Sequence, residues 1–482
     1  MKEKKKNICI DSRAFNLLLL LSSSFFALFS LFLYPPMAAS PNNISLENRL
    51  EGYVGNLSAA QTTALKQLWI KLFALFKQEG QPYVVPTKPA QPETKATGGF
   101  FGFGAKVEPV QKDVFLGATT DEKWLTLPEE KAIELIPGSM LHKTFWNLVA
   151  TDNPDASLCR FLRARKWDCE AAYKMLINTL RWRLVMRVDE IASLGESGLR
   201  DLLNKSLDGM GDSFIKQVHS GKATLGGPDK AGRVVCFINV QLHHKEEQSL
   251  EVVKLLTLYI METSRLACGY PMNNAGLVFN LENFTLSNMD FEFVKFLLGC
   301  LEAYYPETLG SCYIHKAPWV FSTVWAMITP LLDPEVASKI VFTKDLEELT
   351  KYIDVSNLPV IITGNPNRKT KDESTKADPP APGTLNPPQT PAVVAFLGAL
   401  EKYEIVTKAW AETQTVENDT EDAIRRLENG RAYRVARIKA EKDLRGPTIY
   451  HAKGLVKVTD EGRLILDFGV DSSGQIDVTE CV

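Results

Sequence analysis

Residues 312–343 read CYIHKAPWVFSTVWAMITPLLDPEVASKIVFT, and the order of patterns in this stretch decides the fold class. A short apolar run at 312–315 is followed by a longer apolar pattern at 319–332 and by a second short run at 340–343. Apolar runs of about four to eight residues are typical of buried strands, whereas the longer pattern is long enough for a helix. The stretch therefore predicts two parallel strands joined by a helical crossover.

The same alternation occurs upstream of this stretch. Short apolar runs at 234–240 and 277–281 alternate with longer helical patterns at 251–268 and 288–304. This order predicts an α/β fold with a mainly parallel sheet. The helical periodicity of residues 155–183 predicts a small all-helical unit ahead of that sheet.

The length, charge and cysteine content of the chain limit its class. Its 482 residues exceed the roughly 250–300 residues that one hydrophobic core usually supports, so several parts are expected. A net charge of −3 gives no sign of a nucleic-acid partner. The eight cysteines form no Cys-x-x-Cys pair, and no histidines stand at zinc spacing. We therefore expect reduced thiols, no metal and a cytoplasmic protein.

Shifts in composition divide the chain, with Pro-rich and Gly-rich stretches marking the linkers. The expected parts are a hydrophobic leader at 1–36, an amphipathic helix region at 37–80, a flexible linker at 81–120, a helical unit at 121–205, an α/β domain at 206–368, a Pro-rich linker at 369–391 and a charged helical region with a terminal hairpin at 392–482. The last part has no function that its sequence indicates.

The leader contradicts the cytoplasmic assignment. Four lysines among the first six residues precede an apolar run at 14–34, a pattern typical of a signal peptide or a signal anchor. Met37 begins the sequence Met-Ala-Ala-Ser just before the first amphipathic helix. We hypothesise that translation starts at Met37 and that residues 1–36 are a gene-model extension; a membrane anchor is the alternative.

Enzyme motifs are incomplete in this sequence. Gly209-Met-Gly211 resembles the start of a dinucleotide-binding loop, but Phe214 occupies the place of the third glycine. Gly221-Lys222 lacks the upstream glycine of a phosphate-binding loop. We therefore expect a protein that is not an enzyme, with no catalytic residues and no cofactor.

A cation on a predicted core-facing stripe is the first candidate binding feature. Leu158, Leu162 and Arg165 follow one another at i, i+4 and i+7, so Arg165 is expected to be half-buried. An unpaired cation in that position is costly, so the fold must supply either a carboxylate or a ligand phosphate. Lys166 stands beside it and can serve the same anion. Spacing alone leaves the ion pair and the phosphate site equally open.

The pattern at 319–332 is apolar nearly all round, although a helix outside a sheet should have one polar face. Either another domain covers this helix, or it lies over a lipid cavity and meets a membrane when it swings out. Asp333-Pro334-Glu335 then supplies an N-cap, a first-turn proline and an acidic first turn. These residues predict a new short helix and a hinge between the two helices.

Five motifs occur in one order: RFLRARKWD at 160–168, DKAGR at 229–233, YYPETLG at 304–310, HKAPW at 315–319 and LDPEVASK at 332–339. On these motifs, residues from about 155 to 365 resemble the CRAL-TRIO family, most closely its fungal phosphatidylinositol transfer proteins. The resemblance implies a CRAL-TRIO lipid-binding domain behind a helical N-terminal unit, with an apolar gate helix that opens at membranes. The gate residues that it implies are Trp319, Phe321, Trp325, Ile328 and Leu331.

The resemblance also implies a headgroup site. Relatives that bind phosphatidylinositol hold its inositol phosphate with a basic pair, a glutamate and a lysine, which correspond here to Arg165, Lys166, Glu307 and Lys339. Val336 stands where those relatives have a threonine. At 275–277 the chain has Ala-Gly-Leu where phosphatidylcholine-binding relatives have hydroxyl side chains, so we expect choline lipid to bind poorly.

We therefore expect a lipid-binding and transfer protein that carries one phospholipid, phosphatidylinositol or a related lipid, between membranes. It is expected to be a cytoplasmic monomer that is transiently peripheral on a membrane surface. The alternatives are a sterol carrier of the same fold and a lipid-sensing adaptor that recruits a partner through residues 392–482. Deleting these residues is expected to spare transfer and to abolish an adaptor function. A lipid hydrolase needs a nucleophile and a base that the motifs do not supply.

Overall fold

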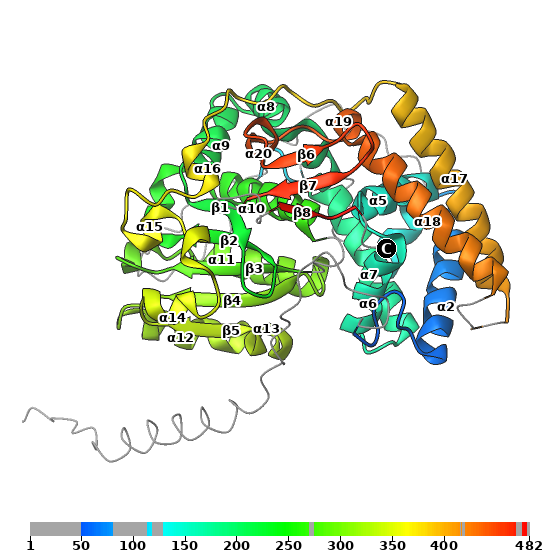
Figure 1. Cartoon of the computed structure of the whole chain (residues 1–482), viewed down its shortest axis with the longest axis horizontal. Helices are drawn as coiled ribbons and strands as arrows, with labels where there is room; N and C mark the ends of the chain where they lie inside the picture. Colours follow the sequence, from blue (N-terminus) through cyan, green and yellow to red (C-terminus); the bar gives the residue numbers. More distant parts are fainter. Residues whose placement is uncertain are drawn as a thin grey trace, which may run out of the picture. The chain divides into compact units, whose positions relative to one another are not determined.

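The structure contains a five-stranded main sheet and a three-stranded smaller sheet, both flanked by helices (Figure 1). This computed structural model describes residues 50–80, 113–117, 129–268, 274–414, 416, 420–468 and 475–479. All of them belong to one unit of the chain, Pro41–Val482.

The main sheet has its strands in chain order. These are β1 (Ala223–Pro228), β2 (Val234–Asn239), β3 (Ala275–Asn280), β4 (Leu309–His315) and β5 (Ile340–Thr343). Strands β2 to β5 are parallel and β1 is antiparallel to β2, which confirms the predicted α/β fold with a mainly parallel sheet. The sequence patterns did not predict β1, because Gly226, Gly227 and Pro228 are poor strand formers. An edge strand tolerates such residues because one of its sides needs no partner.

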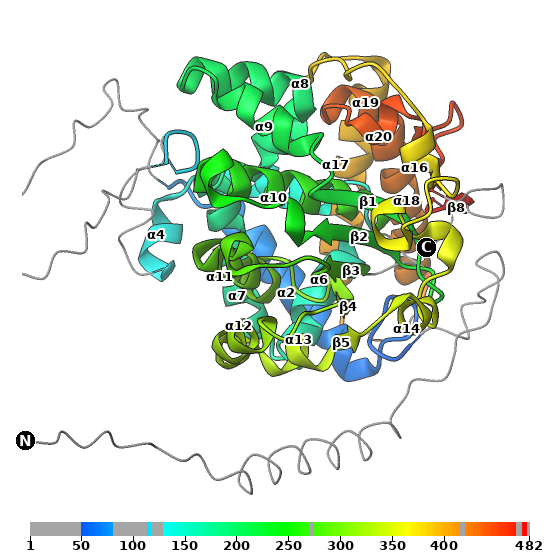
Figure 2. The same ribbon diagram turned by 90° about the vertical axis from the view of Figure 1, so that its left-hand side faces the viewer.

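Helices cover both faces of the main sheet. On one face lie α10 (Leu250–Ser264), α11 (Phe291–Gly299) and α12 (Phe321–Ile328), which Figure 2 shows along one side of the strands. On the other face, α14 (Leu346–Thr350) and α15 (Val360–Thr363) pack against Val278 and Tyr313. Alternate residues of each strand point to opposite faces, so Cys312 and Ile314 contact the α12 side instead.

A group of helices precedes the sheet. They are α2 (Ala59–Leu75), α4 (Glu129–Leu135), α5 (Gly138–Val149), α6 (Pro154–Ala164), α7 (Cys169–Val185), α8 (Val188–Ser206) and α9 (Met210–Val218). Trp69, Phe145, Leu158 and Leu176 are buried in one core shared by α2, α5, α6 and α7. The predicted all-helical unit ahead of the sheet is therefore present.

The C-terminal helices belong to that same core. α17 (Pro391–Glu412) and α18 (Glu421–Lys439) form an antiparallel pair beside α2, orange next to blue in Figure 1. Phe396, Tyr403 and Tyr433 are buried in the core that contains Trp69, and the rings of Trp69 and Tyr403 lie 6.0 Å apart. The two helices therefore complete the hydrophobic core of the N-terminal helices.

The smaller sheet packs on α8 and α10. Its strands are β6 (Val456–Val458), β7 (Leu464–Asp467) and β8 (Gln475–Asp477), which are antiparallel. Leu466 shares a core with Leu199 of α8 and Tyr259 of α10. The hydroxyl of Tyr450 accepts a hydrogen bond of 2.9 Å from the backbone N–H of Leu225, which links this region to β1.

These contacts overturn the deletion experiment that the sequence suggested. Removing residues 392–482 would expose Trp69 and Phe145 to water and would uncover α8 and α10. A loss of transfer would then report unfolding, so the deletion does not separate a carrier from an adaptor.

Residues 113–117 lie in the predicted linker at 81–120, but they are packed. Phe115 is fully buried, and its ring lies 3.8 Å from the guanidinium of Arg187. The carboxylate of Glu251 accepts backbone N–H groups from Val114, Phe115 and Leu116 at 2.7–2.8 Å. These bonds hold the backbone because a buried carboxylate needs such donors, so residues 113–117 are not part of a flexible linker.

Several predictions fall on residues outside the described part, namely the leader at 1–36 and the linker at 81–112 and 118–120. Among the described helices, none has the length and apolar character needed to cross a bilayer. The six described cysteines are free thiols. Burial raises the pKa of Cys236, Cys300 and Cys312 to about 12, so these thiols stay protonated at neutral pH.

Candidate lipid-binding site

A cavity of about 250 Å³ lies between the main sheet and helices α10, α11 and α12. Most of its lining is apolar, with contributions from Ile238, Leu256, Leu277, Phe279, Leu297 and Ile314. A cavity of about 150 Å³ lined by Leu, Ile and Phe already stays dry and binds benzene. This larger cavity therefore suits an apolar ligand.

The cavity is elongated along the strands. Ala275 at the amino end of β3 and Leu281 just beyond its carboxyl end both line it. At a rise of about 3.3 Å per residue, the lining spans about 20 Å along this strand. An elongated apolar space of this kind suits hydrocarbon chains.

Helix α12 forms one wall of the cavity. Phe321 and Val324 are buried on its inner side, and Phe321, Trp325 and Ile328 line the cavity. The ring of Phe321 packs edge-on against Phe284 at 5.6 Å. Of the two explanations for an all-apolar helix, the structure therefore supports a position over a cavity.

Exposed apolar side chains also flank the outer side of α12, which carries the hydroxyls of Ser322 and Thr323 as well. Trp319 is 88% exposed, Met327 49% and Leu331 40%. Of the gate residues implied by the family resemblance, Phe321, Trp325 and Ile328 thus face inward, whereas Trp319 and Leu331 face solvent. An exposed apolar group beside a cavity is suited to contact with a membrane.

The predicted short helix after α12 is present as α13 (Pro334–Ser338). The Asp333 side chain caps it by accepting the N–H of Glu335 at 2.8 Å. The backbone N–H of Asp333 donates to Glu302 at 2.9 Å, which connects the turn between α12 and α13 to the residues that follow α11.

The prediction that Arg165 shares a core-facing stripe is wrong. Helix α6 ends at Ala164, and Arg165 is its C-cap and is exposed. Lys166 and Trp167 follow with φ values of 51° and 66°, so the chain leaves the helix before the stripe reaches position i+7. Arg165 and Lys166 are therefore solvent-accessible cations at the end of α6, available to an anion from outside.

Arg163, and not Arg165, is the half-buried cation near the end of α6. Its Nε atom lies 3.6 Å from Glu307 Oε2, and its Nη1 donates to the carbonyl of Gly52 at 3.0 Å. Its guanidinium also lies 4.0 Å from the ring of Tyr53. This ion pair places Glu307 beside the end of α6. Its partner Arg163 stands two residues before Arg165 in the sequence. The motif RFLRARKWD contained Arg163, but its spacing gave no reason to choose it.

Two of the predicted headgroup residues have a left-handed backbone. Lys166 has a φ of 51° and Glu307 a φ of 60°. Such a conformation is uncommon for residues other than glycine and costs of the order of 1–3 kcal/mol. Five other described residues besides glycine also have a positive φ, so this conformation does not single out the two headgroup residues.

Lys339 lies on the same edge of the sheet as Glu307. Lys339 directly precedes β5, Glu307 stands two residues before β4, and these strands are parallel. Lys339 Nζ lies 3.1 Å from Glu335 Oε1, whose side chain is 64% exposed. Exposed ion pairs contribute about 0–1 kcal/mol, so a ligand phosphate can replace this partner.

A buried ionic network lies behind the cavity. Glu262 of α10 accepts from Arg183 Nη1 of α7 at 2.9 Å and from the hydroxyl of Tyr305 at 2.8 Å, and Arg265 Nη1 lies 3.0 Å from its other oxygen. Arg265 and Tyr305 line both the main cavity and a smaller one of about 40 Å³. Glu262 and Arg265 stand three residues apart, but Arg183 and Tyr305 are distant in sequence, so no local pattern indicates the whole network.

The sheet, the apolar cavity and its wall helix define a class of proteins that bind an apolar ligand. Residues 218–364 match the family model of the CRAL/TRIO domain, and residues 113–178 match that of the CRAL/TRIO N-terminal domain. A phosphatidylinositol transfer protein CSR1 of Eremothecium gossypii is 31% identical over 442 residues, which cover 84% of this chain and 98% of the relative. The chain therefore belongs to the CRAL-TRIO family.

Two other relatives match shorter parts of the chain. A CRAL-TRIO domain-containing protein of Schizosaccharomyces pombe is 41% identical over 273 residues, 56% of this chain and 59% of the relative. Another, from Saccharomyces cerevisiae, is 30% identical over 266 residues, 51% of this chain and 82% of the relative. The first of these is thus matched over little more than half of its own length.

Proposed function

We propose that this protein binds one phospholipid, phosphatidylinositol or a related inositol lipid, and transfers it between membranes. The observation that carries the proposal is the elongated apolar cavity whose wall helix, α12, lies among the exposed apolar side chains of Trp319, Met327 and Leu331. A helix of this kind lies against acyl chains when closed and against a membrane when displaced. The Eremothecium gossypii relative is named a phosphatidylinositol transfer protein, which supports the same function.

The headgroup is proposed to bind at the amino edge of the sheet. Arg165, Lys166 and Lys339 supply cations for the phosphate, and Glu307 accepts hydrogen bonds from inositol hydroxyls. Binding requires Glu307 to share or leave its contact with Arg163, and Lys339 to leave Glu335. A wrong headgroup leaves these groups without partners, and this difference gives specificity. Lipid binding and transfer make and break no covalent bond.

The choline headgroup meets apolar residues at one position of the cavity. Ala275 and Leu277 line the cavity where hydroxyl side chains serve in choline-binding relatives, and both are apolar here. We therefore propose that phosphatidylcholine is transferred poorly.

Mass spectrometry of the lipid that copurifies with the native protein tests the proposal directly. We expect an inositol phospholipid as the main species. Recovery of mainly another lipid class, or of no lipid, would contradict the assignment of phosphatidylinositol.

Replacing Lys339 with alanine is expected to lower phosphatidylinositol transfer between vesicles by about tenfold or more, because a charge-assisted hydrogen bond contributes about 1.5–3 kcal/mol. Thermal stability should stay unchanged, since its partner Glu335 is exposed. Lys344→Ala is the matched control, because Lys344 is an exposed lysine just beyond the other end of β5. Equal transfer by Lys339→Ala and Lys344→Ala would refute the headgroup assignment.

Replacing Leu331 with aspartate is expected to weaken binding to phospholipid vesicles, because a charge on the outer side of the α12 segment opposes insertion. Leu207→Asp is the control, since Leu207 is 44% exposed and Leu331 is 40% exposed. Sedimentation with vesicles measures both variants. If Leu207→Asp and Leu331→Asp bind vesicles equally well, the α12 segment is not the membrane contact.

A further inference from the structure

The smaller cavity, of about 40 Å³, is lined by four arginines and adjoins the main one. Arg265, Cys268, Tyr305 and Thr308 line both cavities. A water molecule needs about 10–15 Å³ of such space, so about three water-sized atoms fit. The smaller cavity is therefore too small for a hydrocarbon chain, but it has room for the oxygens of a small polar group.

Three parts of the chain meet at the smaller cavity. Arg160 of α6 and Arg183 of α7 come from the N-terminal helices, Arg265 follows α10, and Arg445 comes from the C-terminal region. Residues 304–306, just before β4, also line it. The smaller cavity therefore lies at the amino edge of the main sheet, as the candidate headgroup site does.

The arginines around this cavity outnumber the carboxylates that they contact. Among the described residues, Asp152 is the only carboxylate in the lining, and it already accepts from Arg160 and from Ser157. Ion pairs join five guanidinium groups to four carboxylates, namely Arg160, Arg183, Arg265, Arg437 and Arg445 with Asp152, Asp189, Glu262 and Glu441. This part of the network thus has one positive charge in excess, which a bound anion offsets.

Two of these arginines have an N–H group without a partner among the described residues. Arg445 is 7% exposed, its Nε lies 2.8 Å from Glu441, and its Nη1 donates to the carbonyl of Glu262 at 3.4 Å, whereas its Nη2 makes no hydrogen bond. Arg265 uses Nη1 for the Glu262 carboxylate and Nη2 for the carbonyl of Leu148, which leaves its Nε. Buried N–H groups need acceptors, so the lining offers two donors to a ligand.

We propose that the smaller cavity binds a phosphate group, either free phosphate or the phosphate of a lipid whose chains lie in the main cavity. Its oxygens accept from Arg445 Nη2 and Arg265 Nε, and its charge offsets the excess of guanidinium groups. Other groups fit less well. An ammonium is repelled by the arginines, an alkyl group leaves both N–H groups without acceptors, and water offsets no charge. Only the lipid source rests on the proposed function, because it requires acyl chains in the main cavity.

Isothermal titration calorimetry of the full-length protein with inorganic phosphate tests the free anion. Sodium chloride at equal ionic strength is the reference. We expect saturable binding to the wild type and binding weaker by about tenfold or more in Arg445→Lys and in Arg265→Lys, because lysine keeps the charge but loses the planar set of donors.

A transfer assay between vesicles tests the lipid source. Phosphatidic acid is compared with diacylglycerol that has the same acyl chains, so the two lipids differ only in the phosphate. If the phosphate comes from a lipid, the wild type should transfer phosphatidic acid about tenfold or more faster than diacylglycerol, and Arg445→Lys should remove most of this preference. Phosphate binding in the calorimeter without such a preference identifies the free anion as the ligand.

Arg187→Lys is the matched control. Arg187 also contacts a carboxylate, Glu190 at 2.6 Å, but it lines neither cavity. Thermal unfolding checks that each variant folds, and Arg265→Lys decides if Arg445→Lys does not fold. The proposal is wrong if the wild type neither binds inorganic phosphate nor prefers phosphatidic acid, or if the lysine variants behave like Arg187→Lys. The Lys339→Ala experiment is independent of these outcomes, because Lys339 lines neither cavity.

Discussion

Replacing Glu262 with alanine is expected to lower the free energy of unfolding by about 3–5 kcal/mol. Glu262 is 1% exposed and is the shared partner of Arg183, Arg265 and Tyr305. Its removal leaves the Arg183 guanidinium, itself 2% exposed, with Asp189 as its remaining carboxylate partner. Urea denaturation followed by circular dichroism measures the change.

Glu292→Ala is the control for this prediction. Glu292 also contacts a cation, Lys295 at 2.9 Å, but its side chain is 64% exposed. Its replacement should cost less than about 1 kcal/mol. A loss below about 1 kcal/mol in Glu262→Ala as well would show that the buried network does not hold α7 and α10 together.

Glu262 also makes the free energy of unfolding depend on pH. Burial by itself raises the pKa of Glu262, but the guanidinium groups of Arg183 and Arg265 outweigh it and hold this pKa well below the ordinary value of 4.5. Because the folded-state pKa is depressed, the stabilisation is present above the unfolded-state pKa and is lost as pH falls toward the folded-state value. The difference between wild type and Glu262→Ala should therefore be smaller at about pH 3 than at about pH 7.

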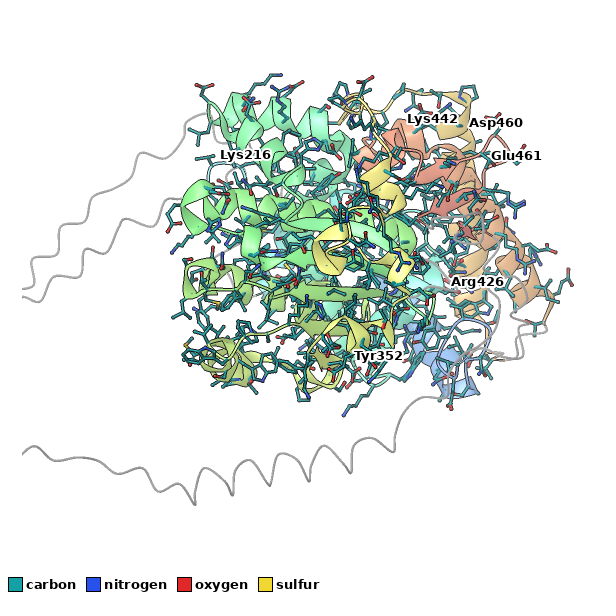
Figure 3. All side chains as sticks on the ribbon, turned by 60° about the vertical axis from the view of Figure 1, so that its left-hand side comes forward. Lys216, Tyr352, Arg426, Lys442, Asp460 and Glu461 are labelled. Carbon is teal, nitrogen blue, oxygen red and sulfur yellow. The ribbon has the colours of Figure 1, made fainter. Side chains whose placement is uncertain are left out.

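Arg426→Met is expected to have an effect of similar size, about 3–5 kcal/mol, because it leaves a carboxylate buried without its cation. Arg426, labelled on α18 in Figure 3, forms a buried ion pair with Asp155 at the start of α6. Its guanidinium also lies 3.9 Å from the ring of Trp410 and donates to Thr407 at 3.2 Å. Asp155 keeps a bond of 2.8 Å from Trp69 Nε1, which does not neutralise its charge.

The neighbouring residue supplies the control. The side chain of Arg425 is 53% exposed and pairs with Asp422 at 3.0 Å, so Arg425→Met should change stability by less than about 1 kcal/mol.

Truncation at residue 391 should have a larger effect than Arg426→Met and should leave an unfolded or aggregated chain. A soluble truncated protein with a cooperative unfolding transition would show that α17 and α18 are dispensable.

Local sequence predicted the strands and helices around the cavity. The runs at 234–240, 277–281, 312–315 and 340–343 each contain most of one strand of the parallel sheet. Regular hydrophobic spacing reports how residues a few positions apart share one face, which makes such elements readable. The cap at Asp333 was readable for the same reason, since the capping side chain and the N–H that it accepts lie two residues apart.

Local sequence patterns did not predict the contacts of the candidate site. A helical stripe assigned Arg165 to the core, but the left-handed residues Lys166 and Trp167 end the helix and leave Arg163 beside Glu307. The family resemblance indicated Glu307 and Lys339, but neither the pairing of Glu307 with Arg163 nor that of Lys339 with Glu335 followed from it. Whether these residues bind an inositol lipid is what the Lys339→Ala experiment decides.

The sequence by itself determined the α/β class, the order of the parallel strands and their crossover helices, the apolar character of the wall helix and the motifs of the family. Only the tertiary structure decided which charges meet, as Glu262 with Arg183, Asp155 with Arg426, and His243 near Asp290. Periodicity and capping act between residues a few positions apart, so a sequence displays them directly. An ion pair between residues that are distant in sequence depends on how whole helices and strands pack, and no local pattern carries that information.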